Sequence, residues 1–212
     1  MTTIAGLDLS LVSTGVALLE HDAFTCPQPI ITARTVGRPG RRSDSYRARS
    51  ARIVQQVRAV VSLVPAGVDL VVLEGPAYGQ HMPSTHDRAG LWWGVFSALT
   101  ARKTPVAVCP PQTRAKYATG KGNADKAMVV DAVREMWPRL DVRGHDEADG
   151  VVLVSIGAHR LGVPLPYPTR DRHAFAVEAV AWPEGLSADL SAATVLGGHS
   201  HAGGRNTPGG FR

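Results

Sequence analysis

The sequence has few cysteines and no long apolar run. Its two cysteines, Cys26 and Cys109, are far apart. They form neither the closely spaced pairs of a zinc site nor a disulfide framework, so we expect a reducing compartment. No apolar run approaches the roughly 18 residues that a membrane span needs, and the start MTTIAGLDLS has no basic segment followed by an apolar signal. We therefore predict a cytoplasmic protein without a membrane segment.

Acidic residues are outnumbered by basic ones. The 212 residues include 18 Asp and Glu against 23 Lys and Arg, which gives a formal net charge of +5, and the sequence pI is near 9.6. This balance favours a polyanionic partner, either nucleic acid or an anionic membrane surface. With 44% hydrophobic residues, the chain can bury a full core, and its length suits one globular domain with an appendage.

Short apolar runs predict five strands. IAGLDLS and GVALLE, separated by VSTG, predict an antiparallel hairpin, and PIITARTV predicts a third strand. VDLVVLEG is apolar almost throughout, which is typical of a central strand covered on both faces. PVAVCPP predicts the fifth strand.

Helical spacing predicts four helices. The first is capped by Ser43 and ends at Pro65, and the second spans residues 84–102. The third lies in ADKAMVVDAVREMW and the fourth in DEADGVVLVSIGAHRLG. The predicted order is therefore β β β α β α β α α. This order predicts an α/β fold, in which three antiparallel strands and two parallel additions form a five-stranded mixed sheet flanked by helices.

The regular pattern ends after Pro164. We predict one α/β domain over residues 1–164 and a C-terminal extension over residues 165–212. Within the extension, HAFAVEAVAW predicts a late strand or a docking segment. The final GGHSHAGGRNTPGGFR is rich in Gly, His and Arg, a composition typical of disorder.

Four acidic residues occupy positions that favour a shared site. Asp8 lies in the first strand, Glu74 ends the central strand, and Asp146 and Asp149 open the last helix. Because Asp146 and Asp149 are three residues apart, they share one helix face, while Glu147 points elsewhere. Helix capping, a turn and a solvated strand end would explain these acids one at a time. An apolar strand that stops on a carboxylate before Gly-Pro instead favours a site in the crevice there.

Four segments carry a resemblance to a known family. GLDLSLVSTGVALLE, VVLEGPAYG, TRAKYATGKGNADKAMVVDAV and HDEADGVVLV, in this order, are similar to the RuvC family of Holliday-junction resolvases, within the RNase H-like superfamily. The likeness covers residues 3–162 and implies an RNase H-like fold. Such a sequence is what we would expect of a phage-encoded or otherwise divergent member of the family. Two departures stand out: Asp8-Leu9-Ser10 replaces the family's Asp-Pro-Gly, and the spacing from Lys116 to Gly120 is one residue short.

The resemblance implies a metal-dependent endodeoxyribonuclease that nicks branched DNA such as Holliday junctions. Asp8, Glu74, Asp146 and Asp149 are then the catalytic, metal-binding carboxylates. Two Mg²⁺ ions about 3.5–4 Å apart can activate water and stabilise the leaving oxygen in phosphodiester hydrolysis, and carboxylate oxygens suit that hard ion. We expect Mn²⁺ to substitute. His145 adjoins the acids and is a candidate to assist a water molecule.

Basic residues provide the candidate DNA contacts. Eight arginines and one acid, Asp44, lie between residues 34 and 58, and they include Arg41, Arg42 and Arg49. A solvated helix face is the alternative, but such faces normally mix signs. By resemblance and by its glycine-bounded position, the segment around Gly120 adds the remaining basic candidates, which are Lys116, Lys121 and Lys126.

Tyr78 lies in the loop after Glu74, where the RuvC family places aromatic residues that enter the junction centre. It is the only aromatic residue of GPAYGQHMPSTHDR. Stacking on an exposed base contributes roughly 1–3 kcal/mol. The alternative is a tyrosine that packs within its own loop.

Three other functions fit parts of the same pattern. GLDLSLVSTGVA also resembles the first phosphate loop of actin-like ATPases, but neither a second Asp-x-Gly loop nor an adenosine motif is present. A non-catalytic module that binds branched DNA would not need all four acids. A nuclease of the RNase H or transposase type would share the metal chemistry and act on a different substrate.

The helix over residues 84–102 carries more apolar surface than one face can bury. Leu91, Val95 and Leu99 form one stripe, which Trp92, Trp93 and Phe96 cannot all share. Exposed aromatics mark interfaces, so we predict a homodimer, and the resemblance places its contact on this helix. The alternative is that HAFAVEAVAW covers these rings within one chain.

Overall fold

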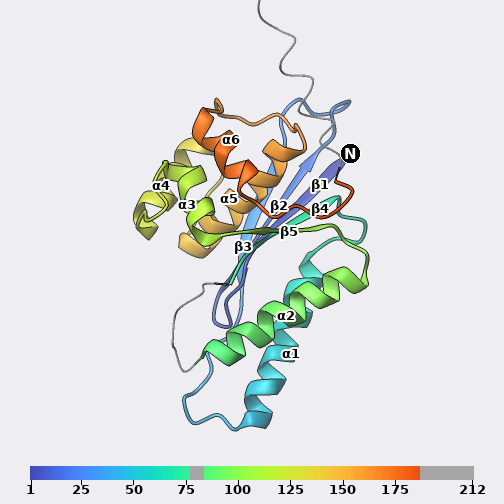
Figure 1. Cartoon of the computed structure of the whole chain (residues 1–212), viewed down its shortest axis with the longest axis vertical. Helices are drawn as coiled ribbons and strands as arrows, with labels where there is room; N and C mark the ends of the chain where they lie inside the picture. The colour runs from blue at the N-terminus through green and yellow to red at the C-terminus, as the bar shows by residue number, and fades with distance from the viewer. Residues whose placement is uncertain (77–83, 187–212) are drawn as a thin grey trace, which may run out of the picture.

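The structure is a computed structural model that describes residues 1–76 and 84–186 (Figure 1). Its strands are β1 Thr2–Asp8, β2 Thr14–His21, β3 Ile30–Val36, β4 Leu70–Glu74 and β5 Val106–Cys109. Its helices are α1 Tyr46–Leu63, α2 Thr85–Ala101, α3 Pro111–Thr119, α4 Lys126–Met136, α5 His145–Arg160 and α6 Asp171–Glu178. No helix in these two ranges is long and apolar enough to cross a membrane.

The strands form one five-stranded sheet in the order β3-β2-β1-β4-β5. β2 pairs antiparallel with both β1 and β3, whereas β4 pairs parallel with both β1 and β5. The predicted mixed sheet is confirmed, as is the hairpin of the first two strands. β4 lies between β1 and β5, and four of its five residues are buried, as expected of a strand covered on both faces.

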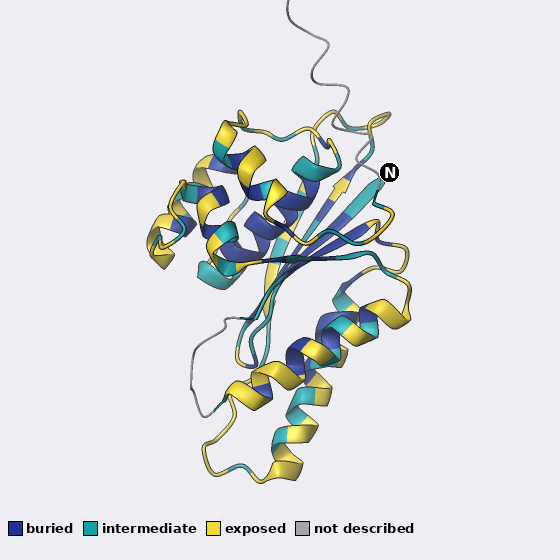
Figure 2. Cartoon of the chain, in the orientation of Figure 1, coloured by how far each residue is buried: buried dark blue, intermediate teal, exposed yellow. Residues whose placement is uncertain are grey.

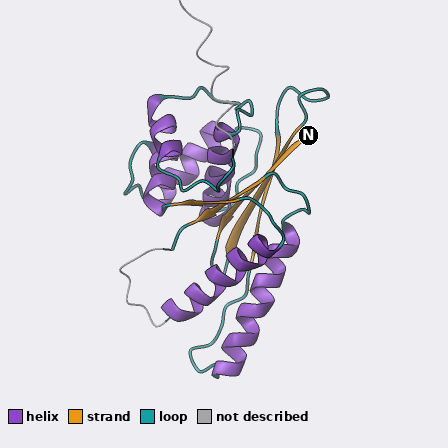
Figure 3. Cartoon of the chain, turned by 45° about the vertical axis from the view of Figure 1, so that its right-hand side comes forward, coloured by secondary structure: helices purple, strands orange, loops and turns teal. Residues whose placement is uncertain are grey.

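Helices cover both faces of the sheet and create two cores. α5 packs on β1, β2 and β4, with α3, α4 and α6 outside it, while α1 and α2 pack together on the opposite face (Figures 1 and 3). Every residue of α5 from 147 to 158 is buried. The exposed surface of α1, in contrast, includes most of its first half (Figure 2).

The structure differs from the predicted elements in three places. α1 begins at Tyr46 rather than after Ser43, because the Ser45 hydroxyl accepts a hydrogen bond from the Ala48 amide and caps the helix there. α3 was not predicted, although Pro111 stands in its first turn and Gly120 closes it in the left-handed conformation.

The segment HAFAVEAVAW forms most of the short helix α6 rather than a strand. α6 buries His173 and Ala176 against the core. Only Ala181 behind it makes a strand-like bridge, to Val108 at the edge of β5. The extension therefore packs on the α/β domain as far as residue 186, and residues 187–212 lie outside the described range.

Candidate active site at the carboxyl ends of β1 and β4

Two of the predicted acids end neighbouring parallel strands. Asp8 is the last residue of β1 and Glu74 the last of β4, and the register pairs Leu7 with Leu73 directly before them. Parallel strands present their carboxyl ends at one edge of a sheet, where ligand sites of α/β folds form. The two carboxylates therefore lie close to one another.

The first turns of α5 bring the other two acids to this edge. Asp146 and Asp149 lie on α5, which crosses β1 and β2 at close range. A Cβ on Gly15 would lie 1.8 Å from the Asp146 carbonyl oxygen, and one on Gly6 would lie 2.3 Å from that of Gly150. Only glycine allows an approach this close, so Gly6 and Gly15 position the acids of α5.

Backbone contacts fix the end of β4. The Trp92 indole Nε1 donates a hydrogen bond of 2.8 Å to the Glu74 carbonyl oxygen, and the Gly75 amide donates one of 2.8 Å to the Cys109 carbonyl oxygen. Trp92 is 9% exposed, so this contact is shielded from water. Through Trp92, the core between α2 and the sheet therefore fixes the backbone position of Glu74.

Arg114 connects two of the acids and was missed in the sequence. From the first half of α3, its Nε contacts Oε2 of Glu74 and its NH1 contacts Oδ1 of Asp149. The side chains of Arg114 and Glu74 are each 14% exposed and that of Asp149 is 8% exposed, so water screens these ion pairs little. The available signal was the Pro-Pro pair directly after β5, which starts a helix at the site edge and orients Arg114 inward.

Burial and mutual repulsion perturb the carboxylates. Burial raises the pKa of Asp8, and the Asp146 charge raises it further against the lowering effect of Arg114. Burial and the Asp8 charge raise the pKa of Glu74 to about 7, again against Arg114. Burial, followed by the Glu74 charge, also raises the pKa of the Cys109 thiol to about 12, so this cysteine stays protonated. The site therefore has a deficit of positive charge.

The chemistry of this donor set fits a hard divalent cation, but its present arrangement does not. Closely placed carboxylates with raised pKa values are stabilised by Mg²⁺ or Mn²⁺. Yet over residues 1–76 and 84–186, no three His, Cys, Asp or Glu side chains are arranged to hold a metal ion. The guanidinium of Arg114 contacts the carboxylates of Glu74 and Asp149 instead.

Two other residues at the start of α5, Glu147 and His145, lie beside the acids. Glu147 is buried, and its Oε2 accepts a hydrogen bond of 2.8 Å from the Arg143 amide, so it points away from the site as predicted. Its contact stabilises the start of α5. The His145 Nε2 lies 3.1 Å from Oδ1 of Asp146, and its side chain is 44% exposed.

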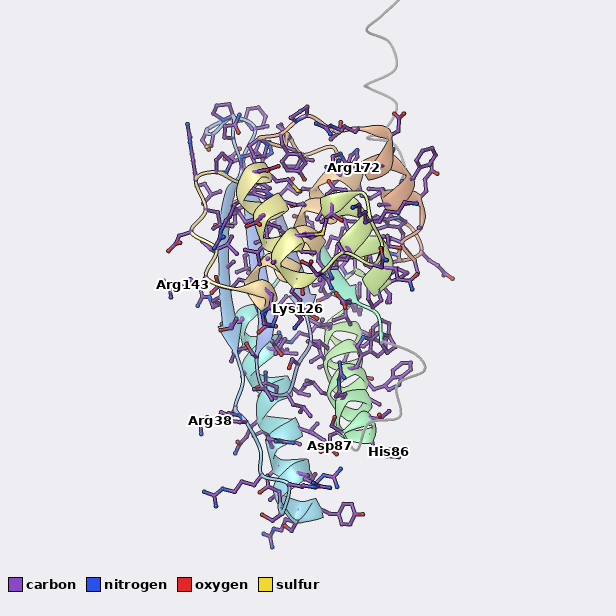
Figure 4. The ribbon with its side chains drawn as sticks, turned by 90° about the vertical axis from the view of Figure 1, so that its left-hand side faces the viewer. Arg38, His86, Asp87, Lys126, Arg143 and Arg172 are labelled. Carbon is purple, nitrogen blue, oxygen red and sulfur yellow. The ribbon has the colours of Figure 1, made fainter. Side chains whose placement is uncertain are left out.

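The predicted basic residues divide into two groups. Lys116, Lys121 and Lys126 are exposed on or beside α3 and α4, and the charge of Lys126 is near enough to Asp8 to lower the pKa of that carboxyl. Figure 4 shows Lys126 between the α3–α6 layer and α1.

Tyr78 lies outside the described residues.

The arginines before and within α1 differ in their contacts. Arg41 and Arg42 are exposed on the loop that leads into the helix. Arg49 instead makes two hydrogen bonds, of 2.9 and 2.7 Å, to the carboxylate of Asp87 at the start of α2, and Arg52 approaches the same group at 3.5 Å. Arg49 therefore ties α1 to α2.

The aromatic residues of α2 are only partly covered. Trp92 stacks on Phe96 with ring centroids 5.2 Å apart, and both rings make edge contacts with Trp93. Trp93 is 60% exposed. The segment HAFAVEAVAW does not cover these rings, because α6 packs against α3 on the other face of the sheet.

Comparisons with known proteins agree with the sequence resemblance. No protein-family model and no curated protein sequence matches the chain. Among solved structures, RuvC of Thermus thermophilus matches with a TM-score of 0.58 and 17% identity, over 78% of this chain and 100% of that chain. The T. thermophilus RuvC complex with a Holliday junction substrate matches with a TM-score of 0.56 and 17% identity, over 79% and 100%.

A eukaryotic protein shares the architecture. The yeast mitochondrial Holliday junction resolvase Ydc2 matches with a TM-score of 0.50 and 11% identity, over 73% of this chain and 76% of that chain. Identities this low establish the fold alone. The chain therefore has the RNase H-like fold of the RuvC-like Holliday junction resolvases.

Proposed function

We propose that the protein is a divalent-metal-dependent endonuclease that nicks branched DNA such as four-way junctions. The observation that carries this proposal is the convergence of Asp8, Glu74, Asp146 and Asp149 at one sheet edge of a RuvC-like fold. The buried, mutually repelling carboxylates need a cation, and a polyanionic substrate accounts for the basic surface around them.

Each group of residues has a distinct part in this reaction. The four carboxylates would hold two Mg²⁺ or Mn²⁺ ions, which supply an activated water and stabilise the leaving 3′-oxygen. Lys126, exposed near Asp8, is placed to contact a phosphate of the bound strand. Arg41 and Arg42 would hold a DNA arm farther from the acids, because phosphate contacts dominate the affinity for DNA.

We further propose that the protein acts as a homodimer. Resolving a four-way junction needs two symmetric nicks, and one acid cluster makes one nick. The exposed ring of Trp93, beside Phe96, is an apolar anchor of the kind found at interfaces. A two-fold axis on α2 would pair the same surface from each subunit.

The two unpaired cysteines are consistent with a reducing compartment such as the cytoplasm.

The proposal is tested by cleavage of a panel of DNA substrates. The purified full chain is incubated in Mg²⁺ or Mn²⁺, and in EDTA, with labelled four-way, three-way, flap and linear duplexes. We expect metal-dependent cuts in branched DNA and none in the linear duplex. Binding of branched DNA without any cut would favour the non-catalytic module, and hydrolysis of ATP without DNA cleavage would favour the actin-like ATPase.

A further inference from the structure

Arg114 places a positive charge in a site that we propose binds divalent metal cations. Its guanidinium contacts carboxylates from two different elements, Glu74 of β4 and Asp149 of α5, where all three side chains are largely shielded from water. A surface arginine gains little from such contacts. Where water screens the charges little, however, the ion pair with Glu74 and the charge-assisted hydrogen bond to Asp149 are considerably stronger. These contacts therefore hold the ends of β4 and α5 together.

No other described cation makes these contacts. The charges of Lys126 and His145 act on Asp8, and that of Arg88 acts on Glu74, at longer range. Over residues 1–76 and 84–186, the only ion pairs of Glu74 and Asp149 are those with Arg114. Removal of this one side chain would thus leave both carboxylates without a direct positive partner.

The position of the guanidinium conflicts with metal binding at the same oxygens. A carboxylate oxygen that accepts an N–H bond from Arg114 directs that lone pair at the arginine, and a divalent ion beside the guanidinium would be repelled by its charge.

We propose that Arg114 is the internal counterion of the acid cluster, and that a divalent cation binds there only by displacing its guanidinium from Glu74 and Asp149. The proposal rests on the proposed function for the identity of the metal. Metal loading is then an exchange of cations, in which the ion pairs of Arg114 are broken before the full set of carboxylate oxygens is available. Arg114 stabilises the metal-free protein and weakens its affinity for metal.

The test measures metal binding without DNA. Isothermal titration of MgCl₂ and MnCl₂ into the full chain compares wild type, Arg114→Leu and the control Arg134→Leu. The control removes the same charge from an exposed position on α4, where Arg134 lies 3.4 Å from Asp131. We expect Arg114→Leu to bind Mg²⁺ about tenfold more tightly or better, because one charge-assisted bond is enough for that factor. Arg134→Leu should match the wild type.

Thermal unfolding supplies a second measurement. Arg114→Leu should melt below the wild type in EDTA and gain more than the wild type from added Mg²⁺. If the leucine variant does not fold, Arg114→Lys replaces it. A lysine keeps the charge but cannot engage two carboxylates through a planar fork, so its Mg²⁺ affinity should exceed that of the wild type by a smaller factor.

The outcomes separate this proposal from the proposed function. An Arg114→Leu or Arg114→Lys variant that binds Mg²⁺ no more tightly than the wild type would overturn the counterion role and leave the nuclease function standing. Tighter metal binding without cleavage of any branched DNA would support the counterion role and remove the nuclease function. If neither wild type nor variants bind a divalent ion, both proposals fall.

Discussion

The helices on the two faces of the sheet differ in how they serve the site. α5 is buried at every position from 147 to 158, and it carries Asp146 and Asp149 in its first turns. α1 buries only Gln56, Val60 and Val61 among its 18 residues, and none of its four arginines is buried. Core packing thus fixes the acid cluster, whereas the arginine-rich segment of residues 34–58, called the basic arm below, is fixed at a few points only. Changes on the two faces should therefore have different consequences.

The largest effect is expected where the backbone of α5 approaches the sheet. In Gly15→Ala, the new Cβ would lie 1.8 Å from the Asp146 carbonyl oxygen, so the start of α5 must shift. We expect a loss of about 1–3 kcal/mol in the free energy of unfolding, as for other overpacked sites, together with weaker Mg²⁺-dependent cleavage. Urea denaturation and a cleavage assay measure the two effects.

Gly144→Ala is the matched control for this change. Gly144 flanks the same acids, but a Cβ there would meet no atom within 4 Å, so only the loss of a glycine N-cap is expected, at under about 1 kcal/mol. Equal stability and equal cleavage for the two variants would show that the close approach of α5 does not position the acids.

The exposed aromatic surface of α2 should control assembly. Trp93→Glu places a charge on a residue that is 60% exposed, so we expect a folded protein that self-associates poorly and leaves singly nicked junctions. Trp92 is unsuitable for this test because it is buried and its indole holds the Glu74 carbonyl. Light scattering that shows a wild-type monomer at micromolar concentration, with paired cuts nonetheless, would refute the dimer.

The basic arm should affect binding without affecting chemistry. In the double variant Arg41→Gln/Arg42→Gln, the slope of log Kd against log salt should fall by about 0.9 for each arginine that binds a phosphate in the wild type, while the cleavage rate at saturating DNA stays near that of the wild type. Arg49 is left intact because its bonds to Asp87 tie α1 to α2. An unchanged slope would remove Arg41 and Arg42 from the DNA interface.

The smallest effect concerns the C-terminal extension. Burial, reinforced by the charge of Arg172, lowers the pKa of His173 to about 4, against about 6.5 in an unfolded chain. The unfolded protein therefore binds this proton more readily, so stability is complete above about pH 6.5 and falls as the pH drops towards 4. We expect the melting temperature to fall by a few degrees over that window.

Variants locate this effect on α6. His173→Gln should flatten the pH dependence of the melting temperature, whereas His86→Gln, at an exposed position on α2, should retain it. If both variants keep the wild-type curve, His173 does not determine the acid sensitivity.

Regular patterning made most of the fold predictable. The spacing of apolar residues, and the Gly and Pro residues that bound the elements, predicted most of them. These are the hairpin, the buried strand β4 and the long helices α2, α4 and α5. The helices α3 and α6 were missed because nine and eight residues give too few turns for a clear period. A shared site for Asp8 and Glu74 was predicted because an apolar strand that stops on a carboxylate before Gly-Pro favours a site in the crevice there.

Contacts between distant residues were not predictable from the sequence. The role of Arg114 depends on α3, an element that the pattern did not predict, and on Asp149, 35 positions away. Arg49 was predicted to contact DNA, and no sequence pattern indicated its hydrogen bonds to Asp87, which lies 38 positions away. In both cases a local run of charge gave no information about which carboxylate would lie opposite.

The most direct test of the account compares two neighbouring acids of α5. Asp146→Asn removes a proposed metal ligand, whereas Glu147→Gln changes a carboxylate that points away and accepts a hydrogen bond from the Arg143 amide. In Mg²⁺, on a labelled four-way junction, we predict that Asp146→Asn loses cleavage by about 10³-fold or more, from several kcal/mol of metal stabilisation, and still binds the junction. Glu147→Gln should cut like the wild type. Full cleavage by Asp146→Asn would contradict the assignment of the active site.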